Sequence, residues 1–373
     1  MLEHPSPQPT HQQFLLQKRP PSSVGRIASL IVVLGCTLLF MLPASANTIT
    51  VTTANDSGAG SLRQAILDAT AGDTIDFDGS LADSTILLTN GSLTIDKALT
   101  IAATIPITVS GNGSSQVITA SAPLTLTGFT IADGNTINEG AGVYAGDSLV
   151  VRNMHFANND NSNNGDVDGG AIFALGALDV DSSTFIANTA RRSGGAIHAN
   201  DALTVTRSTF LDNVAVTGAG GAIDHSNGNQ PITLSSDGRI VNSVFARNTI
   251  GDGSEIFGIN LQSTGHVDVL HNTIIGDDSF FGTAIAVNGG SATISNTIII
   301  SYVTGIDASN GSVIEDYNLF NTVSVELISL DPLGSNDRTD LTGNNGPAFA
   351  DPTNDDYHLL ATSDAIDHGI NTE

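Results

Sequence analysis

The stretch that decides the fold is GGAIHANDALTVTRSTFLDNVA, residues 194–215, because similar stretches lie on both sides of it. Residues 169–190 read GGAIFALGALDVDSSTFIANTA, and the tetrapeptide GGAI returns at residues 220–223. A period of about 25 residues is typical of solenoids, in which each repeat adds one coil to a stack. The sequence therefore predicts a repetitive chain of stacked coils.

The repeats align on one large apolar residue per unit: Ile131, Phe156, Phe185, Phe210, Phe245, Ile275, Ile299 and Leu319. Three residues after the phenylalanines stands an asparagine: Asn159, Asn188, Asn213 or Asn248. Alternating runs such as Leu203-Thr204-Val205 are typical of half-buried strands, and the Gly-Gly pairs and asparagines supply turns. The missing helical pattern disfavours a leucine-rich repeat.

These features predict an all-β fold, a parallel β-helix over residues 95–330 with three short strands in each coil. The general bias of parallel crossovers predicts a right-handed coil. The phenylalanines are expected to stack in one internal column. The polar residues three positions before them, such as Asn153 and Ser182, are expected to form a ladder at a turn.

The ends of the repeat region need protection, because an open coil exposes apolar edges. Residues 47–94 are predicted to form an N-terminal strand and a short capping helix. Ser61 and Gln64 form a capping-box pattern, and Leu62 and Ile66 lie on one apolar helix face. The repeat fades in residues 331–373, which are predicted to be an irregular capping segment.

Residues 1–46 have the pattern of a signal peptide. Basic residues precede an apolar run over residues 27–42, and small residues follow up to Ala46, where cleavage is expected. A retained anchor is the alternative, but the run is shorter than the ~20 residues that a spanning helix needs. A lipoprotein signal at Cys36 is disfavoured, because the apolar run continues past it. Cys36 is the only cysteine, so no disulfide is expected after cleavage.

The chain is strongly acidic, with 38 Asp and Glu residues, 12 Lys and Arg residues and a formal net charge of −26. Such a field repels phosphate backbones and anionic lipid headgroups, which argues against nucleic-acid binding and against membrane insertion of the processed chain. Divalent cations and neutral or cationic surfaces remain compatible partners.

Two segments resemble motifs of a known group of proteins. GSLRQAILDA, residues 60–69, resembles the CSLREAI segment near the start of many exported bacterial β-helix proteins, and SDAIDHG, residues 363–369, resembles their SPAIDAG segment. The resemblance implies a pectin lyase-like β-helix that is secreted or held at the cell surface or outer membrane, often adhesin-like. It implies no activity. Gly60, Gln64, Asp364 and His368 depart from the two consensus motifs.

Two coils carry long insertions, at residues 158–168 and 224–239, and long loops in solenoids often mark a binding face. Alternation along the GGAI strands points one residue of each coil outward, and this row reads Tyr144, Phe173, His198 and Asp224. Aromatic rings and carboxylates on such a row suit a sugar-binding groove. We therefore predict ligand binding by this row and by the neighbouring His225. Ordinary surface residues are the alternative interpretation.

Catalysis is the competing hypothesis, because parallel β-helices also host polysaccharide lyases and hydrolases. The candidate catalytic residues are His198, Asp224 and Arg192, which lie on neighbouring coils. A lyase needs a base and a group that neutralises a uronate carboxylate, whereas a hydrolase needs two carboxylates, for which Asp168 and Asp224 are candidates. The sequence lacks the paired aspartates and Gly-His-Gly of pectinases.

No cofactor is required by these patterns, although calcium is a candidate. Asp160, Asn164, Asp166 and Asp168 follow part of the spacing of a calcium-binding EF-hand loop. Ala171 stands where that loop needs a bidentate glutamate, so a solvated polar loop is the alternative interpretation. The histidines show no metal-ligand spacing.

Three functions follow from these patterns. The first is a non-catalytic exported β-helix that binds surface or matrix material, with polysaccharide or cell-surface glycan as the partner. The second is a polysaccharide lyase or glycoside hydrolase, and the third is a structural spacer at the cell surface. A tight His/Arg/carboxylate cluster in the groove would favour the enzyme over the other two.

Overall fold

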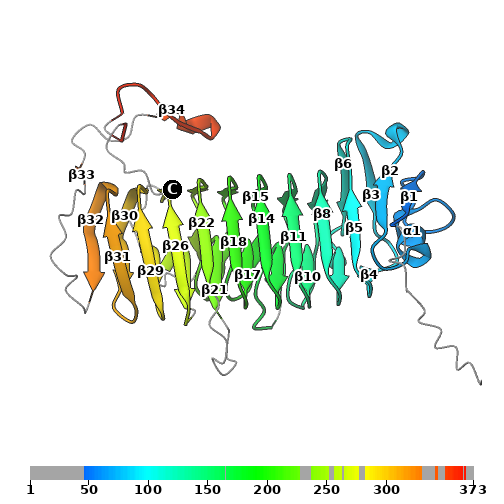
Figure 1. The fold of residues 1–373 in the computed structure, drawn as a ribbon, viewed down its shortest axis with the longest axis horizontal. Helices are drawn as coiled ribbons and strands as arrows, with labels where there is room; N and C mark the ends of the chain where they lie inside the picture. The colour runs from blue at the N-terminus through cyan, green and yellow to red at the C-terminus, as the bar shows by residue number, and fades with distance from the viewer. Residues whose placement is uncertain are drawn as a thin grey trace, which may run out of the picture. The chain divides into compact units, whose positions relative to one another are not determined.

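The computed structural model describes residues 46–163, 165–226, 237–251, 256–262, 264–276, 282–329, 341–342, 349–363 and 365–366. The predicted signal peptide lies outside them, except for Ala46. The described chain is a right-handed parallel β-helix whose strands stack coil upon coil, as Figure 1 shows. The predicted fold class is confirmed. Among the described residues, no helix is long and apolar enough to cross a membrane.

Each coil contributes strands to three faces. The first face is an 11-stranded parallel sheet made of β1 (Thr48–Val51), β2 (Thr74–Phe77), β5 (Leu99–Ala102), β8 (Leu124–Thr127), β11 (Leu149–Arg152), β14 (Leu178–Asp181), β18 (Leu203–Thr206), β22 (Gly238–Val241), β26 (His266–Leu270), β29 (Ser291–Ser295) and β31 (Ser312–Asp316). We call it the outer sheet.

The second face carries the phenylalanines and is called the Phe face. It comprises β3 (Ser84–Leu87), β6 (Ile107–Ser110), β9 (Thr130–Ala132), β12 (His155–Ala157), β15 (Thr184–Ile186), β19 (Thr209–Leu211), β23 (Val244–Ala246) and β27 (Thr273–Ile275). A small parallel sheet follows it, made of β16 (Thr189–Ala190), β20 (Val214–Ala215) and β24 (Thr249–Ile250).

The third face carries the GGAI strands and is called the GGAI face. It comprises β4 (Leu93–Ile95), β7 (Ile118–Ala120), β10 (Val143–Ala145), β13 (Ile172–Ala174), β17 (Ile197–Ala199), β21 (Ile223–Ser226), β25 (Ile256–Gln262) and β28 (Thr283–Val287). The long strands β30 (Ile298–Ala308) and β32 (Leu319–Ser329) run through both faces and so join them into one sheet, which β33 (Leu341–Thr342) extends.

The predicted phenylalanine column is present inside the coils. Phe156, Phe185, Phe210 and Phe245 stack with ring centroids 4.7–4.8 Å apart and interplanar angles of 1–6°, and each is at most 1 % exposed. This separation is the usual spacing of neighbouring strands, so the rings follow the backbone ladder. The column anchors the register of the central coils.

After this column the predicted register is wrong by one residue at Ile275 and at Leu319, whereas Ile299 occupies its predicted position. Phe245 pairs with Ile274 rather than with Ile275, and Ile299 pairs with Phe320 rather than with Leu319. The outward side of these coils is apolar as well, because Ile298, Ile300 and Leu319 pack with Phe349 and Ala365 of the C-terminal segment. Apolar residues on both sides of a strand remove the alternation that fixes register.

The predicted turns contain left-handed backbone residues and, next to them, hydrogen-bonded ladders of polar side chains. Asn153, Ser182, Arg207 and Asn242, three residues before the phenylalanines, have φ values of 47–52° and turn the chain in the left-handed region. Hydrogen-bonded ladders lie two residues before the phenylalanines, where the Ser183 amide donates to Ser208 Oγ at 3.1 Å, and three residues after the phenylalanines. There Asn159 Nδ2 donates to Asn188 Oδ1 at 2.9 Å, and Asn188 Nδ2 donates to Asn213 Oδ1 at 2.9 Å.

The N-terminal cap is the helix α1 (Leu62–Asp68), in which the Ser61 side chain accepts from the Gln64 amide at 3.2 Å. Leu62 and Ile66 are buried against the first coils. Parallel pairing already begins at β1, so the solenoid starts before the predicted boundary at residue 95. The other short elements are η1 (Gly79–Leu81), η2 (Pro352–Asn354) and the antiparallel pair β34 (Phe349–Asp351) and β35 (Asp356–Leu359).

Candidate functional site

The outward row of the GGAI face has the predicted order. Parallel pairing places Tyr144 beside Phe173, Phe173 beside His198, and His198 beside Asp224, and extends the row to Asn260. The aromatic part is stacked, with ring centroids 5.8 Å apart for Tyr144 and Phe173 and 5.0 Å apart for Phe173 and His198. The strand ladder therefore sets the spacing of these side chains.

The predicted exposure of Phe173 is wrong. Its side chain lies outside the internal core cluster, yet it is only 7 % exposed. Tyr144 covers one ring face and His198 covers the other, so no ring face is open for a sugar. Alternation along a strand predicts the side of the sheet to which a side chain points. It does not predict how much of that side chain its neighbours cover.

His198 is the most deeply buried charged group of the row, with 1 % of the residue exposed. Its Nδ1 lies 2.9 Å from Asp224 Oδ2 and 3.7 Å from Asp168 Oδ2. The shorter contact is an ion pair that is not aligned as a hydrogen bond. Burial lowers the pKa of His198, but the carboxylates of Asp224 and Asp168 outweigh burial and raise it above its ordinary value.

Asp224 is held from three sides. Its Oδ2 faces His198 and accepts from Ser226 Oγ at 2.8 Å, and its Oδ1 accepts from Asn260 Nδ2 at 2.5 Å. Burial raises the pKa of Asp224, but its contacts with His198, Asn260 and Ser226 outweigh burial and lower it. Because Ser226 donates to the aspartate and not to the histidine, these three residues do not form a nucleophilic Ser-His-Asp triad.

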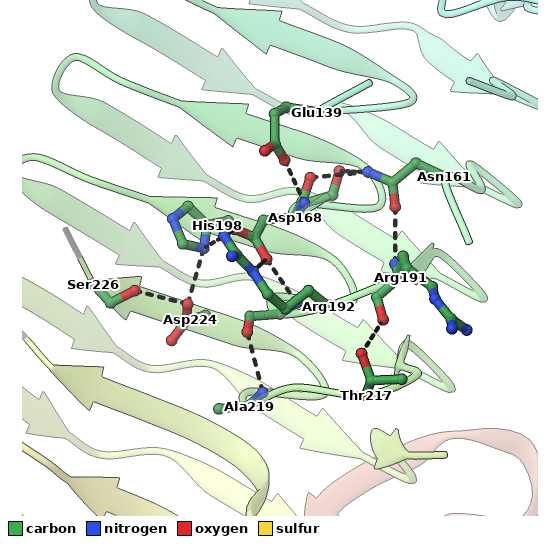
Figure 2. Close-up of polar contacts among 12 residues, drawn as sticks. Glu139, Asn161, Asp168, Arg191, Arg192, His198, Thr217, Ala219, Asp224 and Ser226 are labelled. Atoms are coloured by element: carbon green, nitrogen blue, oxygen red, sulfur yellow. Dashed lines mark hydrogen bonds and ion pairs between the residues drawn. The ribbon is translucent and has the colours of Figure 1, made fainter. Parts of the chain in front are cut away.

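A second ion pair lies beside the first. Arg192 donates to Asp168 through Nε at 2.8 Å and through Nη2, and the Ser193 amide donates to Asp168 Oδ1 at 2.8 Å. The Asp168 amide in turn donates to Glu139 Oε2. Burial raises the pKa of Glu139 above its ordinary value and outweighs the hydrogen bond from the Asp168 amide, which lowers it. Figure 2 shows Asp168, Arg192, His198 and Asp224 converging on one place.

These side chains line an open cleft of about 180 Å³, which we call the His198 cleft. Its lining residues are Asp168, Arg192, Ser193, His198, Ala219, Asp224, Ser226, Asn260 and Gln262. Both predicted loop insertions contribute, since Asp168 ends the first and Ser226 lies near the start of the second. The three candidate catalytic residues thus meet in one polar cleft.

His225 does not belong to the His198 cleft, so its predicted role in ligand binding is not supported. Alternation along β21 turns it inward, where it is fully buried and its Nε2 lies 3.0 Å from the Asp201 carbonyl oxygen. Burial lowers the pKa of His225. It follows that Asp224 and His225, although adjacent in sequence, face opposite sides of the strand.

The calcium loop is only partly described, because Asn164 lies outside the described residues. Asp160 Oδ1 accepts from the Ser162 amide at 2.7 Å, and the Asp168 carboxylate is engaged by Arg192. Within the described part of the chain, no group of three or more His, Cys, Asp or Glu side chains is placed to hold a metal ion. Calcium binding by this loop stays a prediction. The carboxylate of Asp168 is not free to act as one of the calcium ligands.

Sequence reasoning did not identify Glu139, Ser226 or Asn260 as parts of the site. Asn260 belongs to the outward row, but the GGAI motif has faded to IFGI, residues 256–259, in its coil. Glu139 is separated from Asp168 by 29 positions and reaches it through the backbone amide. Extending the outward row by one coil would have found Asn260, whereas no sequence signal indicates Glu139.

Comparison with known proteins adds one finding. No protein-family model and no curated protein matches the sequence. A crystal structure of pectate lyase Pel9A matches with a TM-score of 0.55, over 88 % of this chain and 92 % of that chain, at 14 % identity. The two chains share a fold. At this identity, the likeness carries no conclusion about activity or substrate.

Proposed function

We propose that this chain is a glycan-binding β-helix and that the His198 cleft is its binding site. The observation that carries the proposal is the network of Asp168, Arg192, His198 and Asp224 at the floor of an open cleft. A buried ion pair often contributes less stability than apolar packing of similar volume. A network at the outer side of a sheet, where an apolar row would suffice for folding, therefore supports a binding role.

The arrangement suits a polar ligand such as a sugar. Asp224 and Asp168 are each fixed by at least two hydrogen bonds or ion pairs, so little side-chain freedom is lost when a ligand binds. The cleft is small and open, which fits one sugar unit of a longer chain rather than an enclosed small molecule. The glycan would run along the GGAI face, past Asn260 and Gln262.

The proposed setting is outside the cell, at the surface or in the surrounding matrix. The leader pattern of residues 1–46 and the two motif resemblances support export. The shared fold with a pectate lyase supports a polysaccharide as the partner. The alternative is a structural spacer that binds no ligand. A binding screen would distinguish this alternative from the proposal.

The direct test is a glycan array with the processed protein, followed by calorimetry on each hit with the parent and the Asp224→Asn variant. We expect the variant to bind at least about tenfold more weakly, because it loses the charge that organises His198 and Ser226. The matched control is Asp268→Asn, which removes an exposed carboxylate beside His266 on the outer sheet. Equal affinity of parent and Asp224→Asn for every hit would refute the assignment of the site.

Polysaccharide cleavage is a second candidate, because Asp168, Arg192, His198 and Asp224 form the tight His/Arg/carboxylate cluster that favours an enzyme. The pKa values of the cluster are also pushed apart. The pKa of His198 and the pKa of Glu139 are raised, whereas the pKa of Asp224 is lowered. Such separation within one cluster of side chains is typical of acid–base sites. Release of reducing ends, or of the ultraviolet-absorbing double bond of a lyase product, would reveal cleavage, and His198→Gln should abolish it. Bound polysaccharides that stay intact would exclude this candidate.

A further inference from the structure

One outward row of the Phe face consists almost entirely of threonines. Parallel pairing places one residue from each strand between β3 and β27 on this row. Its members are exposed or half-buried, and they are Thr85, Thr108, Thr130, His155, Thr184, Thr209, Val244 and Thr273. The C-terminal segment reaches the last two strands, where Arg247 donates to Tyr357 and Leu359 lines a pocket with Thr273. We call the outward side of the other six strands, β3, β6, β9, β12, β15 and β19, the threonine face.

The six described strands of the threonine face present no charged side chain to the solvent. Two residues beyond each member of the row stands a small or aliphatic residue, and this second row reads Leu87, Ser110, Ala132, Ala157, Ile186 and Leu211. The only ionisable side chain on either row is that of His155. Burial lowers the pKa of His155, which keeps its imidazole uncharged at neutral pH. The face is therefore uncharged, although the chain has a formal net charge of −26.

The preference of threonine for strands does not explain this pattern. Strands in general favour β-branched residues, so the outer sheet of the same coils should then be equally free of charge. Its strands β11 and β14, in the coils of β12 and β15, instead point Arg152, Asp179 and Asp181 outward. The absence of charge thus belongs to one face of these coils. Because charged residues are depleted at the core of interfaces, this difference indicates an interaction surface.

The threonine face is also flat and regular. Behind it, the rings of Phe156, Phe185 and Phe210 stack 4.7–4.8 Å apart with interplanar angles of 1°. These coils therefore stack with little of the twist, about 20° per strand, that sheets usually have. Side chains along a row repeat at the strand spacing of about 4.8 Å, and the two rows lie about 6.7 Å apart, which is twice the rise per residue. Because threonine is stiff at χ1, its hydroxyl and methyl groups hold these positions.

These properties restrict the partner of the threonine face. A second copy of this chain would bring another net charge of −26 close to the first, and the repulsion between the two copies opposes pairing. A crystalline polysaccharide is best met by aromatic rings that stack on its sugars, and His155 is the only ring on the two rows. The partner that fits is flat, uncharged and regular, and it is bound through hydroxyl and methyl groups.

We propose that the threonine face binds ice. The oxygen atoms on the faces of hexagonal ice repeat at distances close to both spacings of the threonine face, so the array meets many lattice positions at once. Each threonine hydroxyl can donate one hydrogen bond to lattice water and accept others, while the methyl groups and the second row cover the water between them. A rigid array loses little freedom on binding, so many weak contacts add up. This function is independent of the His198 cleft, which lies on the GGAI face.

The test is the growth of a single ice crystal in a solution of the processed protein, measured as the gap between its melting and freezing temperatures. We expect the parent protein to open such a gap. Thr184→Lys puts a long charged side chain in the middle of the threonine face and should remove most of the gap. Thr130→Lys, on the same row, should have the same effect and replaces the first variant if that variant does not fold. Thr204→Lys is the matched control, because Thr204 points outward on the outer sheet between Asp179 and Arg239, and it should leave the gap unchanged.

The outcomes that would overturn the inference are distinct from those that concern the glycan site. An ice crystal that grows in the parent solution as it does in serum albumin would show that the protein does not bind ice. Equal loss of the gap in Thr184→Lys and Thr204→Lys would show that the threonine face is not the site. Adsorption to microcrystalline cellulose, or dimerisation, that Thr184→Lys abolishes without any parent effect on ice would assign the face to that other partner. None of these results changes the outcome of the glycan array.

Discussion

Replacement of Asp224 by asparagine should destabilise the fold in a way that depends on pH. The side chains of His198 and Asp224 are 2 % and 4 % exposed, so solvent screens their ion pair very little. Removing one partner of a buried pair typically costs about 3–5 kcal/mol. Asparagine keeps one acceptor oxygen for Ser226 or Asn260. We therefore expect the free energy of unfolding to fall by about 3 kcal/mol in mildly acidic solution, which is near the lower end of that range.

The direction of the pH dependence follows from the two pKa shifts. The pKa of His198 is raised in the folded protein, so its contribution is complete below the unfolded value of about 6.5 and is lost as pH rises through the folded value. The pKa of Asp224 is lowered, so its contribution is present above the unfolded value of about 3.9 and is lost as pH falls through the folded value. The pair is therefore most stabilising between about pH 4 and pH 6.5.

Urea unfolding of parent and Asp224→Asn at about pH 6 and about pH 10 measures this effect. The difference in free energy of unfolding should shrink at the higher pH, because the parent loses the imidazolium charge. The control Asp268→Asn removes an exposed partner of His266 and should change stability by no more than about 1 kcal/mol. A loss that is the same at both pH values, or smaller than that of the control, would refute the ion-pair reasoning.

Three further predictions concern the coils around the site. Phe210→Ala should cost about 3–5 kcal/mol in urea unfolding, since it removes a fully buried ring from the middle of the column; unchanged stability would mean that the ring is not internal. Phe173→Ala should lower the melting temperature, because the ring is 7 % exposed and stacked on both faces; an unchanged melt would mean that it is free to meet a ligand. Asn188→Ala should speed hydrogen exchange of the Asn159 amide, which donates to Asn188 Oδ1 at 3.1 Å; unaltered exchange would contradict the ladder.

The coil architecture was predictable because several local signals agree. Glycine pairs, alternating strands, a recurrent phenylalanine and an asparagine three residues later all repeat with one period, and each has a separate structural reason. The prediction of register was wrong only where these signals weaken, after Phe245. There the outward positions, such as Ile275, are apolar too, because the C-terminal segment packs on the adjoining coils.

The candidate site was only partly predictable for a different physical reason. Period-two alternation places His198 and Asp224 on one outward row, and the row is present in the structure. Alternation says nothing about coverage, so the burial of Phe173 was missed. The network also depends on Glu139, whose contact with the Asp168 amide comes from the path of a loop rather than from any repeat.

The most direct test of glycan binding in the His198 cleft is an NMR titration that follows the histidine ring signals, with His198 assigned from its loss in His198→Gln. Addition of the tightest-binding oligosaccharide from the array should shift the His198 ring signals in step with binding. The signals of His155, on the outward side of the Phe face, should stay in place. Saturating binding that leaves the His198 signals unchanged, or that moves His155 instead, would contradict the account.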